Sequence, residues 1–250
     1  MINAQKFGRG KLTLVLLHGW GGEWRSWFPL IERLKTQFKI YALDLPGFGE
    51  SPLDRPYSLH DYAQDIVDFI AQERIKNPVF VGHSLGGAIA LKIALEKHEI
   101  ASGLVLIGAA GVRPELDMKK RIVMSIAKTG KTVLSLPGIN RFREPIRKTF
   151  YRKLGLLDAG YYDAKNEILK RTFSKLCRED LTSEFQSIHT PTLILWGEKD
   201  SATLLRSGKK THEAIRGSEM ITFPNAGHFV YLEEQEKCAD AIARFVSSIQ

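Results

Sequence analysis

Residues 79–88 read Val-Phe-Val-Gly-His-Ser-Leu-Gly-Gly-Ala, which predicts a buried strand, a tight turn and the start of a helix. The turn has the spacing Gly82-x-Ser84-x-Gly86, which is typical of a nucleophile elbow. Small residues two positions before and after the serine let the strand and the helix approach closely. Ser84 would then stand at a helix N-terminus, where backbone N–H groups favour negative charge. The place of the motif between strand and helix makes Ser84 a candidate nucleophile.

Short apolar runs and longer amphipathic stretches alternate along most of the chain. The apolar runs predict strands at residues 12–17, 39–43, 78–81, 103–107, 192–196 and 219–223. The amphipathic stretches predict helices at residues 27–37, 59–73, 85–97, 204–215 and 233–249. Nearly continuous apolar strands are typical of a sheet covered by helices on both faces. The sequence therefore predicts an α/β fold with a mostly parallel sheet.

The alternation stops between residues 113 and 185. Helical patterns at residues 118–135, 145–154 and 161–176 follow one another there without a strand-like run between them. The strand pattern then resumes at Pro191. This predicts a helical cap at 113–185 that is inserted into a core made of residues 1–112 and 186–250.

The predicted cap is strongly basic. Residues 113–185 hold 17 Lys or Arg and 9 Asp or Glu, so they account for the net charge of +8 of the 250-residue chain. Such a segment suits an anionic substrate, an acidic protein or a membrane surface. A solvated helix face explains the same charges, because long basic side chains are easily exposed. The basic residues show no recognition motif for nucleic acid, and no nucleic-acid binding is expected.

Two further polar side chains follow predicted strands in the C-terminal part. Asp200 comes after the strand that ends at Trp196, and His228 comes after the strand that ends at Phe223. The carboxyl ends of parallel strands meet at one edge of a sheet, so these two side chains are expected beside Ser84. There His228 would take the serine proton as general base, and Asp200 would fix the histidine tautomer.

Bland interpretations stay open for the polar residues nearby. Asp200 is alternatively a loop carboxylate, with Glu198 as the orienting acid, and His228 is alternatively a turn histidine. His18 and His83 are expected to pack or hydrogen-bond as structural residues, since His228 already occupies the base position in the chain order.

These segments resemble the α/β-hydrolase superfamily over nearly the whole chain. The matching motifs are His-Gly at 18–19, Asp-x-Pro-Gly-x-Gly-x-Ser at 44–51, Gly-x-Ser-x-Gly at 82–86, Trp-Gly-x-x-Asp at 196–200 and Gly-His at 227–228. The resemblance implies the α/β-hydrolase fold with an inserted cap, and a structural role for the turn at 44–51. It also implies that the backbone N–H groups of Trp20 and Leu85 form the oxyanion hole. The short N-terminus is expected to keep one antiparallel edge strand, at residues 2–7.

Within that family, residue identities narrow the reaction. Serine at position 84 argues against the dehalogenases and epoxide hydrolases of this fold, which use an aspartate nucleophile. Leu85 departs from cofactor-free haloperoxidase-like members, Phe229 from carbon–carbon bond hydrolases, and His83 from proline iminopeptidases. Hydrolysis of a carboxylic ester, thioester or lactone through an acyl-enzyme is the reaction expected.

The substrate is less constrained by the sequence. Phe142, Phe150, Tyr151 and Phe229 are the candidates for an apolar substrate pocket, although aromatic residues at helical spacing in the cap also fit a cap core. One alternative is a pimeloyl-carrier-protein methyl ester esterase that uses the basic cap to meet an acidic carrier protein. Others are an interfacial lipase and a small-molecule receptor that retains the triad.

The remaining calls concern what the chain lacks. No cofactor and no metal site are expected, and Cys177 and Cys238 are interpreted as separate reduced thiols. The apolar run at 12–17 is too short to span a membrane and lacks a signal-peptide cleavage pattern, so a cytoplasmic location without an integral membrane segment is expected.

Overall fold

Seven strands form one sheet in the computed structural model, which describes residues 1–113 and 166–249. The strands are β1 (Ala4–Phe7), β2 (Thr13–Leu17), β3 (Lys39–Leu43), β4 (Val79–His83), β5 (Gly103–Ile107), β6 (Thr192–Gly197) and β7 (Glu219–Phe223). Their order across the sheet is β1-β3-β2-β4-β5-β6-β7. Only β1 runs antiparallel to its neighbour, and the other five pairings are parallel. The predicted parallel sheet and the single antiparallel edge strand are confirmed.

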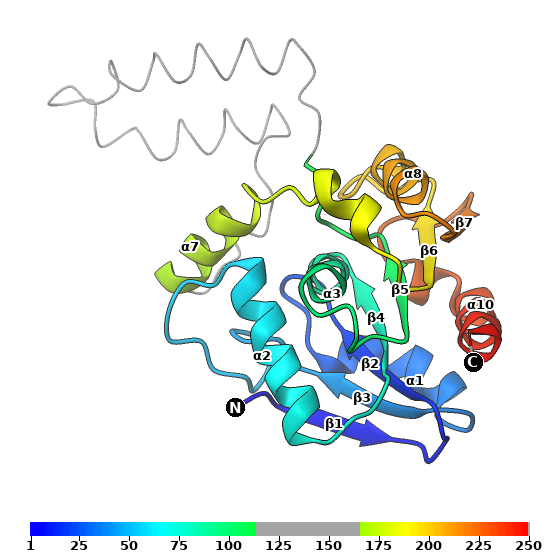
Figure 1. The fold of residues 1–250 in the computed structure, drawn as a ribbon, viewed down its shortest axis with the longest axis horizontal. Helices are drawn as coiled ribbons and strands as arrows, with labels where there is room; N and C mark the ends of the chain where they lie inside the picture. Colours follow the sequence, from blue (N-terminus) through cyan, green and yellow to red (C-terminus); the bar gives the residue numbers. More distant parts are fainter. Residues whose placement is uncertain (114–165, 250) are drawn as a thin grey trace, which may run out of the picture. The chain divides into compact units, whose positions relative to one another are not determined.

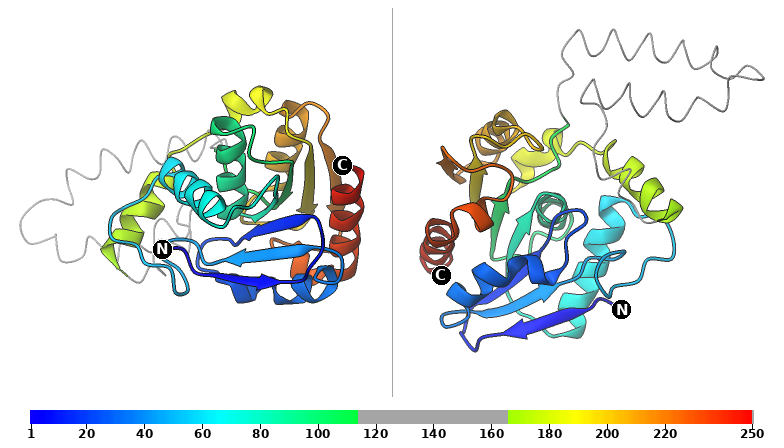
Figure 2. Two further views of the ribbon diagram at one scale, coloured as in Figure 1. Left: turned by 60° about the horizontal axis from the view of Figure 1, so that its bottom comes forward. Right: turned by 180° about the vertical axis from the view of Figure 1, so that it is seen from behind.

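The helices cover both faces of this sheet. They are η1 (Trp24–Trp27), α1 (Phe28–Leu34), α2 (Leu59–Gln72), α3 (Leu85–Glu96), α7 (Glu167–Leu176), η3 (Thr182–Ser187), α8 (Leu205–Ala214), α9 (Val230–Glu233) and α10 (Gln235–Ser248). Figures 1 and 2 show α2 and α3 on one face and α1 and α10 on the other. The helix predicted to begin at residue 233 is preceded by the short helix α9, which the sequence pattern did not indicate.

Alternation along the strands fills two hydrophobic cores, one on each face. In β2, Val15 and Leu17 enter the core beneath α2 and α3, while Leu14 and Leu16 enter the core beneath α1 and α10. All four side chains are fully buried. Successive side chains of a strand point to opposite faces, so a strand between two helical layers needs apolar residues at every position. This explains the continuous apolar runs of the sequence.

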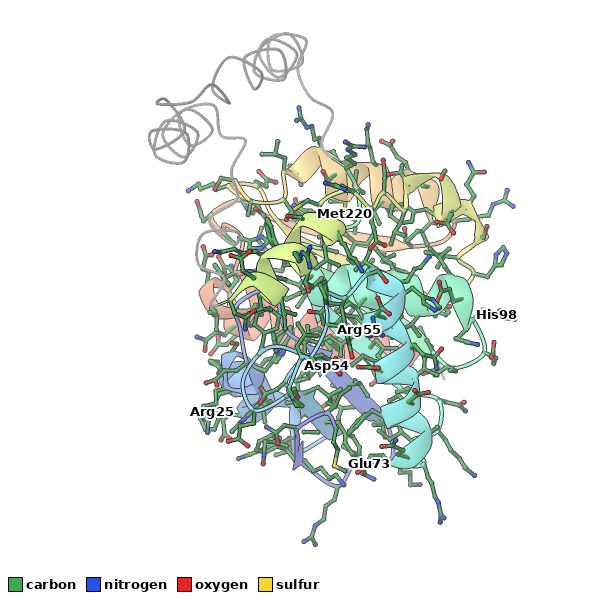
Figure 3. The ribbon with its side chains drawn as sticks, turned by 90° about the vertical axis from the view of Figure 1, so that its left-hand side faces the viewer. Arg25, Asp54, Arg55, Glu73, His98 and Met220 are labelled. Atoms are coloured by element: carbon green, nitrogen blue, oxygen red, sulfur yellow. The ribbon has the colours of Figure 1, made fainter. Side chains whose placement is uncertain are left out.

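Helix α2 shows how local sequence fixes the ends of these elements. Ser58 is its N-cap: its hydroxyl accepts from the Asp61 N–H at 3.3 Å, and the Asp61 carboxylate accepts from the Ser58 N–H at 2.7 Å. Arg55 adds an ion pair of 2.9 Å to Asp61, and Glu73 at the other end pairs with Lys6 of β1 at 2.6 Å (Arg55 and Glu73 are labelled in Figure 3). The two reciprocal bonds of the capping box satisfy donors that every helix start leaves open.

The segment between β5 and β6 is described only in part. Residues 114–165, which include most of the predicted cap, lie outside the described residues. Helix α7 overlaps the helix predicted at 161–176, and Leu181 and Phe185 are buried in the core on the α3 side. The boundaries of the predicted cap stay a prediction. Within the described residues, no helix is long and apolar enough to cross a membrane.

Candidate active site

The carboxyl ends of the parallel strands bring the predicted site residues to one edge of the sheet. Ser84 follows β4, Asp200 follows β6 and His228 follows β7. Strands β3 and β4 lie on opposite sides of β2, so the chain reverses its direction of winding there. In open α/β sheets, ligands bind at the carboxyl ends of the strands beside such a reversal.

Ser84 has a strained backbone at the junction of β4 and α3. Its φ is 50° and its ψ is −111°, a conformation that costs a non-glycine residue about 1–3 kcal/mol. Hydrogen bonds hold it there: the Ser84 N–H donates to Ile107 O at 3.0 Å, and the Ser84 carbonyl accepts from Ala110 N–H at 2.9 Å. The serine thus stands at the first turn of α3, as the elbow motif predicts.

The glycines around Ser84 are required by close approach of the backbone. A Cβ added at Gly82 would lie 2.4 Å from the Gly86 carbonyl oxygen, and one added at Gly86 would lie 1.9 Å from the Leu17 carbonyl oxygen. Both distances are far shorter than any real Cβ contact. The prediction that small residues flank the serine at two positions before and after it is confirmed.

Asp200 and His228 are joined by a short hydrogen bond. His228 Nδ1 lies 2.8 Å from Asp200 Oδ2, and the Asp200 side chain is fully buried. The other carboxylate oxygen accepts from the backbone N–H groups of Ala202 and Thr203, each at 2.8 Å. The Thr203 hydroxyl lies 2.8 Å from Asp200 Oδ2. The carboxylate is therefore surrounded by donors in a site without bulk water.

These donors determine the charge of Asp200. Burial alone would raise its pKa, but the hydrogen bonds from His228 and Thr203 outweigh burial, and the pKa of Asp200 lies below its ordinary value. An ionised Asp200 can only accept, so Nδ1 of His228 carries the proton and Nε2 keeps the lone pair. That tautomer is the one that a general base needs.

His18 and His83 are buried beside this pair and are neutral. Burial lowers the pKa of His18 to about 4 and that of His83 to about 3. The Leu45 N–H donates to His18 Nε2 at 3.0 Å, so His18 Nδ1 carries a proton and donates to the Gly19 carbonyl at 2.7 Å. His18 therefore fixes the start of the loop after β2, which is a structural role.

The loop after β2 lies against the nucleophile. A Cβ added at Gly19 would lie 3.2 Å from Ser84 Cβ, so Gly19 is in direct contact with the serine. The next residue, Trp20, packs its ring edge-on against Phe48 at 5.0 Å and against Phe173 of α7 at 4.9 Å between ring centroids. Leu85 is the first residue of α3, and N–H groups in a first helical turn have no acceptor within the helix. The assignment of Trp20 and Leu85 as oxyanion donors stays a prediction.

Comparison with known proteins supplies the family. A family model described as the alpha/beta hydrolase family matches residues 14–241. The AB hydrolase superfamily protein YisY of Bacillus subtilis is 31% identical over 265 residues, which cover 98% of this chain and 94% of that protein. The chain belongs to the alpha/beta hydrolase family.

More distant relatives of this alpha/beta hydrolase include esterases. The pimeloyl-[acyl-carrier protein] methyl ester esterase of Vibrio campbellii is 24% identical over 97% of both chains. The solved structure of an esterase from Exiguobacterium antarcticum matches with a TM-score of 0.76 at 26% identity, over 98% of this chain and 95% of that chain. The α/β-hydrolase fold expected from the motifs is confirmed, and hydrolase activity is supported at the level of the family.

The candidate site of this alpha/beta hydrolase includes one predicted pocket residue. Phe229 is 47% exposed and contacts the rings of His228 and His83 at centroid distances of 5.3 and 5.1 Å. Phe142, Phe150 and Tyr151 lie outside the described residues.

Glu198, the alternative acid, does not join the pair. It is exposed and accepts from the Thr222 hydroxyl at 2.9 Å, whereas Asp200 meets His228. Among residues 1–113 and 166–249, no three His, Cys, Asp or Glu side chains form a group that could hold a metal ion.

Two residues that support the pair escaped the sequence analysis. Thr203 donates to Asp200 and also approaches His228 Nδ1 at 3.3 Å and the Gly108 carbonyl at 2.9 Å. Gly108 has a φ of 49°, and a Cβ there would lie 3.1 Å from Asp200 Oδ2 and 3.2 Å from His228 Nδ1. A glycine directly after a predicted strand was the available signal for the second, and the position of Thr203 three residues after Asp200 was the signal for the first.

Proposed function

We propose that this alpha/beta hydrolase is a serine esterase that cleaves carboxylic ester, thioester or lactone bonds through an acyl-enzyme. The observation that carries the proposal is the 2.8 Å bond from His228 Nδ1 to the buried carboxylate of Asp200, at the sheet edge where Ser84 heads α3. A histidine held in this tautomer is suited to accept a serine proton.

In the proposed reaction, Ser84 Oγ attacks the substrate carbonyl carbon while His228 Nε2 takes the hydroxyl proton. Asp200 stabilises the imidazolium that forms. The N–H groups of Trp20 and Leu85 bind the carbonyl oxygen as it becomes negative. His228 then protonates the leaving alcohol, thiol or ring oxygen. Water hydrolyses the acyl-enzyme by the same steps in reverse, which regenerates the free serine.

The first experiment measures the burst and steady-state release of p-nitrophenol from p-nitrophenyl acetate. The wild type is expected to show a burst and to be labelled covalently by a fluorophosphonate, and Ser84→Ala is expected to lose both. Ser102→Ala is the matched control, because its hydroxyl bonds only to the exposed Asn77 carbonyl region, at 2.8 Å from that oxygen. A wild type with neither turnover nor labelling would favour a receptor that retains the triad and would reject the esterase.

A second candidate is an esterase for an acyl chain on an acidic carrier protein. It is favoured by the similarity to the Vibrio campbellii methyl ester esterase and by the 17 Lys or Arg against 9 Asp or Glu in residues 113–185. The test is charge reversal of Arg147 and Lys148 together. Carrier-linked methyl ester hydrolysis should slow while p-nitrophenyl acetate turnover stays unchanged, and an equal effect on both substrates rejects this candidate.

A further inference from the structure

The backbone on both sides of His228 is held by a single carboxylate. Glu233 Oε2 accepts from the Gly227 N–H at 2.8 Å, and Glu233 Oε1 accepts from the Phe229 N–H at 3.2 Å. The two oxygens of one side chain thus bridge the residues directly before and after the histidine. A carboxylate that accepts two N–H bonds fixes both distance and orientation, since its two oxygens are rigidly joined.

Helix α9 places Glu233 for this contact. Its single turn begins immediately after Phe229, and the Leu232 and Glu233 N–H groups donate to the Phe229 carbonyl at 2.8 and 3.0 Å. The turn folds the Glu233 side chain back onto the loop from which the helix starts. The arrangement is similar to a capping box, in which an acidic side chain reaches back to a backbone N–H before the helix.

The remaining backbone group of this segment, the His228 carbonyl, is held by His83. A carbonyl can only accept, so His83 Nε2 carries a proton and donates it at 3.0 Å. His83 is 2% exposed, and its ring lies 4.5 Å from the His228 ring and 5.1 Å from the Tyr231 ring between centroids. Because His83 directly precedes Ser84, this bond ties the loop of the proposed base to the strand of the proposed nucleophile.

We propose that Glu233 and His83 are positioning residues that set the backbone of His228, and through it the place of its imidazole relative to Ser84. Asp200 fixes the rotation of the ring at Nδ1, but the position of the ring also depends on the peptide that carries it. That peptide lies in a loop between β7 and α9, where no strand pairing restrains it. Three hydrogen bonds from two side chains supply that restraint. The inference rests on the proposed role of His228 as general base.

The first test compares Glu233→Ala and Glu233→Gln with the control Glu236→Ala. Glu236 lies in the first turn of α10, its side chain is 85% exposed, and its nearest ion-pair partner is Arg33 at 4.0 Å. For p-nitrophenyl acetate, Glu233→Ala should lower kcat roughly tenfold with KM within about twofold, because a displaced base weakens the transition state more than substrate binding. Glu233→Gln should lose less, since one amide oxygen still accepts one N–H. Glu236→Ala should match the wild type.

The second test exchanges His83. His83→Gln keeps an N–H donor and should retain most of kcat, whereas His83→Leu removes the donor and should lower kcat as Glu233→Ala does. The matching spectroscopic signature is the proton NMR signal of His228 Nδ1–H, which should broaden in Glu233→Ala and His83→Leu but not in Glu236→Ala. Glu233→Gln serves where Glu233→Ala does not fold.

The outcomes separate this proposal from the proposed function. If Ser84→Ala is inactive while Glu233→Ala and His83→Leu keep kcat within about twofold of the wild type, the positioning role is wrong and the esterase stands. If the wild type itself shows no turnover, the esterase is rejected, and the Nδ1–H signal still decides the positioning role. An unchanged signal in both variants overturns it, and broadening in both supports it.

Discussion

Acidification from pH 8 to pH 5 is expected to lower the free energy of unfolding by about 4 kcal/mol, through the two buried histidines His18 and His83. Both side chains are almost inaccessible to solvent, with exposed fractions of 0% and 2%. Burial lowers the pKa of His18 to about 4 and the pKa of His83 to about 3, from the ordinary value of 6.5.

The sign follows from which state binds more protons. Below pH 6.5 these histidines take up protons in the unfolded chain while they stay neutral in the folded protein, so stability falls as the pH falls. The loss continues until the pH reaches the lowered values of about 4 and about 3. Each histidine contributes about 1.4 kcal/mol per pH unit below 6.5, which gives about 2 kcal/mol each at pH 5. Asp200 does not add to this window, because its lowered pKa places its effect at lower pH.

Urea unfolding followed by tryptophan fluorescence at pH 8 and pH 5 measures the difference. His18→Gln and His83→Gln should each reduce the pH-dependent difference by about 2 kcal/mol, whatever their effect on stability at pH 8. The difference between pH values is the informative quantity, since it cancels the cost of the substitution itself. A wild type with equal stability at the two pH values, or variants that keep the full difference, would refute this account.

Three further predictions concern the candidate site. Gly108→Ala places a Cβ about 3 Å from both Asp200 and His228 at a positive φ, so esterase kcat should fall at least tenfold, as steady-state kinetics can check. Thr203→Val removes the hydroxyl bond to Asp200 and should lower kcat/KM roughly tenfold, while Thr203→Ser should restore most of it in the same assay. Ser84→Gly should be inactive yet more stable to urea than Ser84→Ala by about 1 kcal/mol, since glycine adopts the φ of 50° without strain; equal stability contradicts the strain.

The sequence predicted the sheet because its signal is strong and local. A strand such as β2 needs apolar side chains on both faces, and Leu14 to Leu17 supply four in a row. Ser84, Asp200 and His228 were predicted to lie together because each follows a strand, and parallel strands end at the same edge. The N-terminal end of α8 and the extension of β4 to His83 differ from the prediction by one or two residues, which is where periodicity carries least information.

The supporting contacts were not predictable in the same way. The need for glycine at 108 arises from Asp200 and His228, which are distant in the chain, and the sequence near Gly108 carries no trace of them. Glu233 occupies a position that periodicity assigns to the start of a long helix. Its contact with Gly227 and Phe229 depends on the break between α9 and α10. Side chain to backbone bonds of this kind follow from loop conformation, which apolar patterning does not encode.

Three histidines gather at this edge of the sheet, and their environments separate the roles. A general base must gain and lose a proton near the working pH. His18 and His83 have their pKa lowered to about 4 and about 3 by burial, so both stay neutral through the range in which esterases are assayed. His228 remains as the histidine that can cycle its charge, and the ionised Asp200 at 2.8 Å stabilises its imidazolium. The neutrality of His83 matters for the same step, since a second positive ring at 4.5 Å would oppose the charge that forms on His228. This electrostatic argument identifies His228 as the proposed base independently of the Gly-His motif.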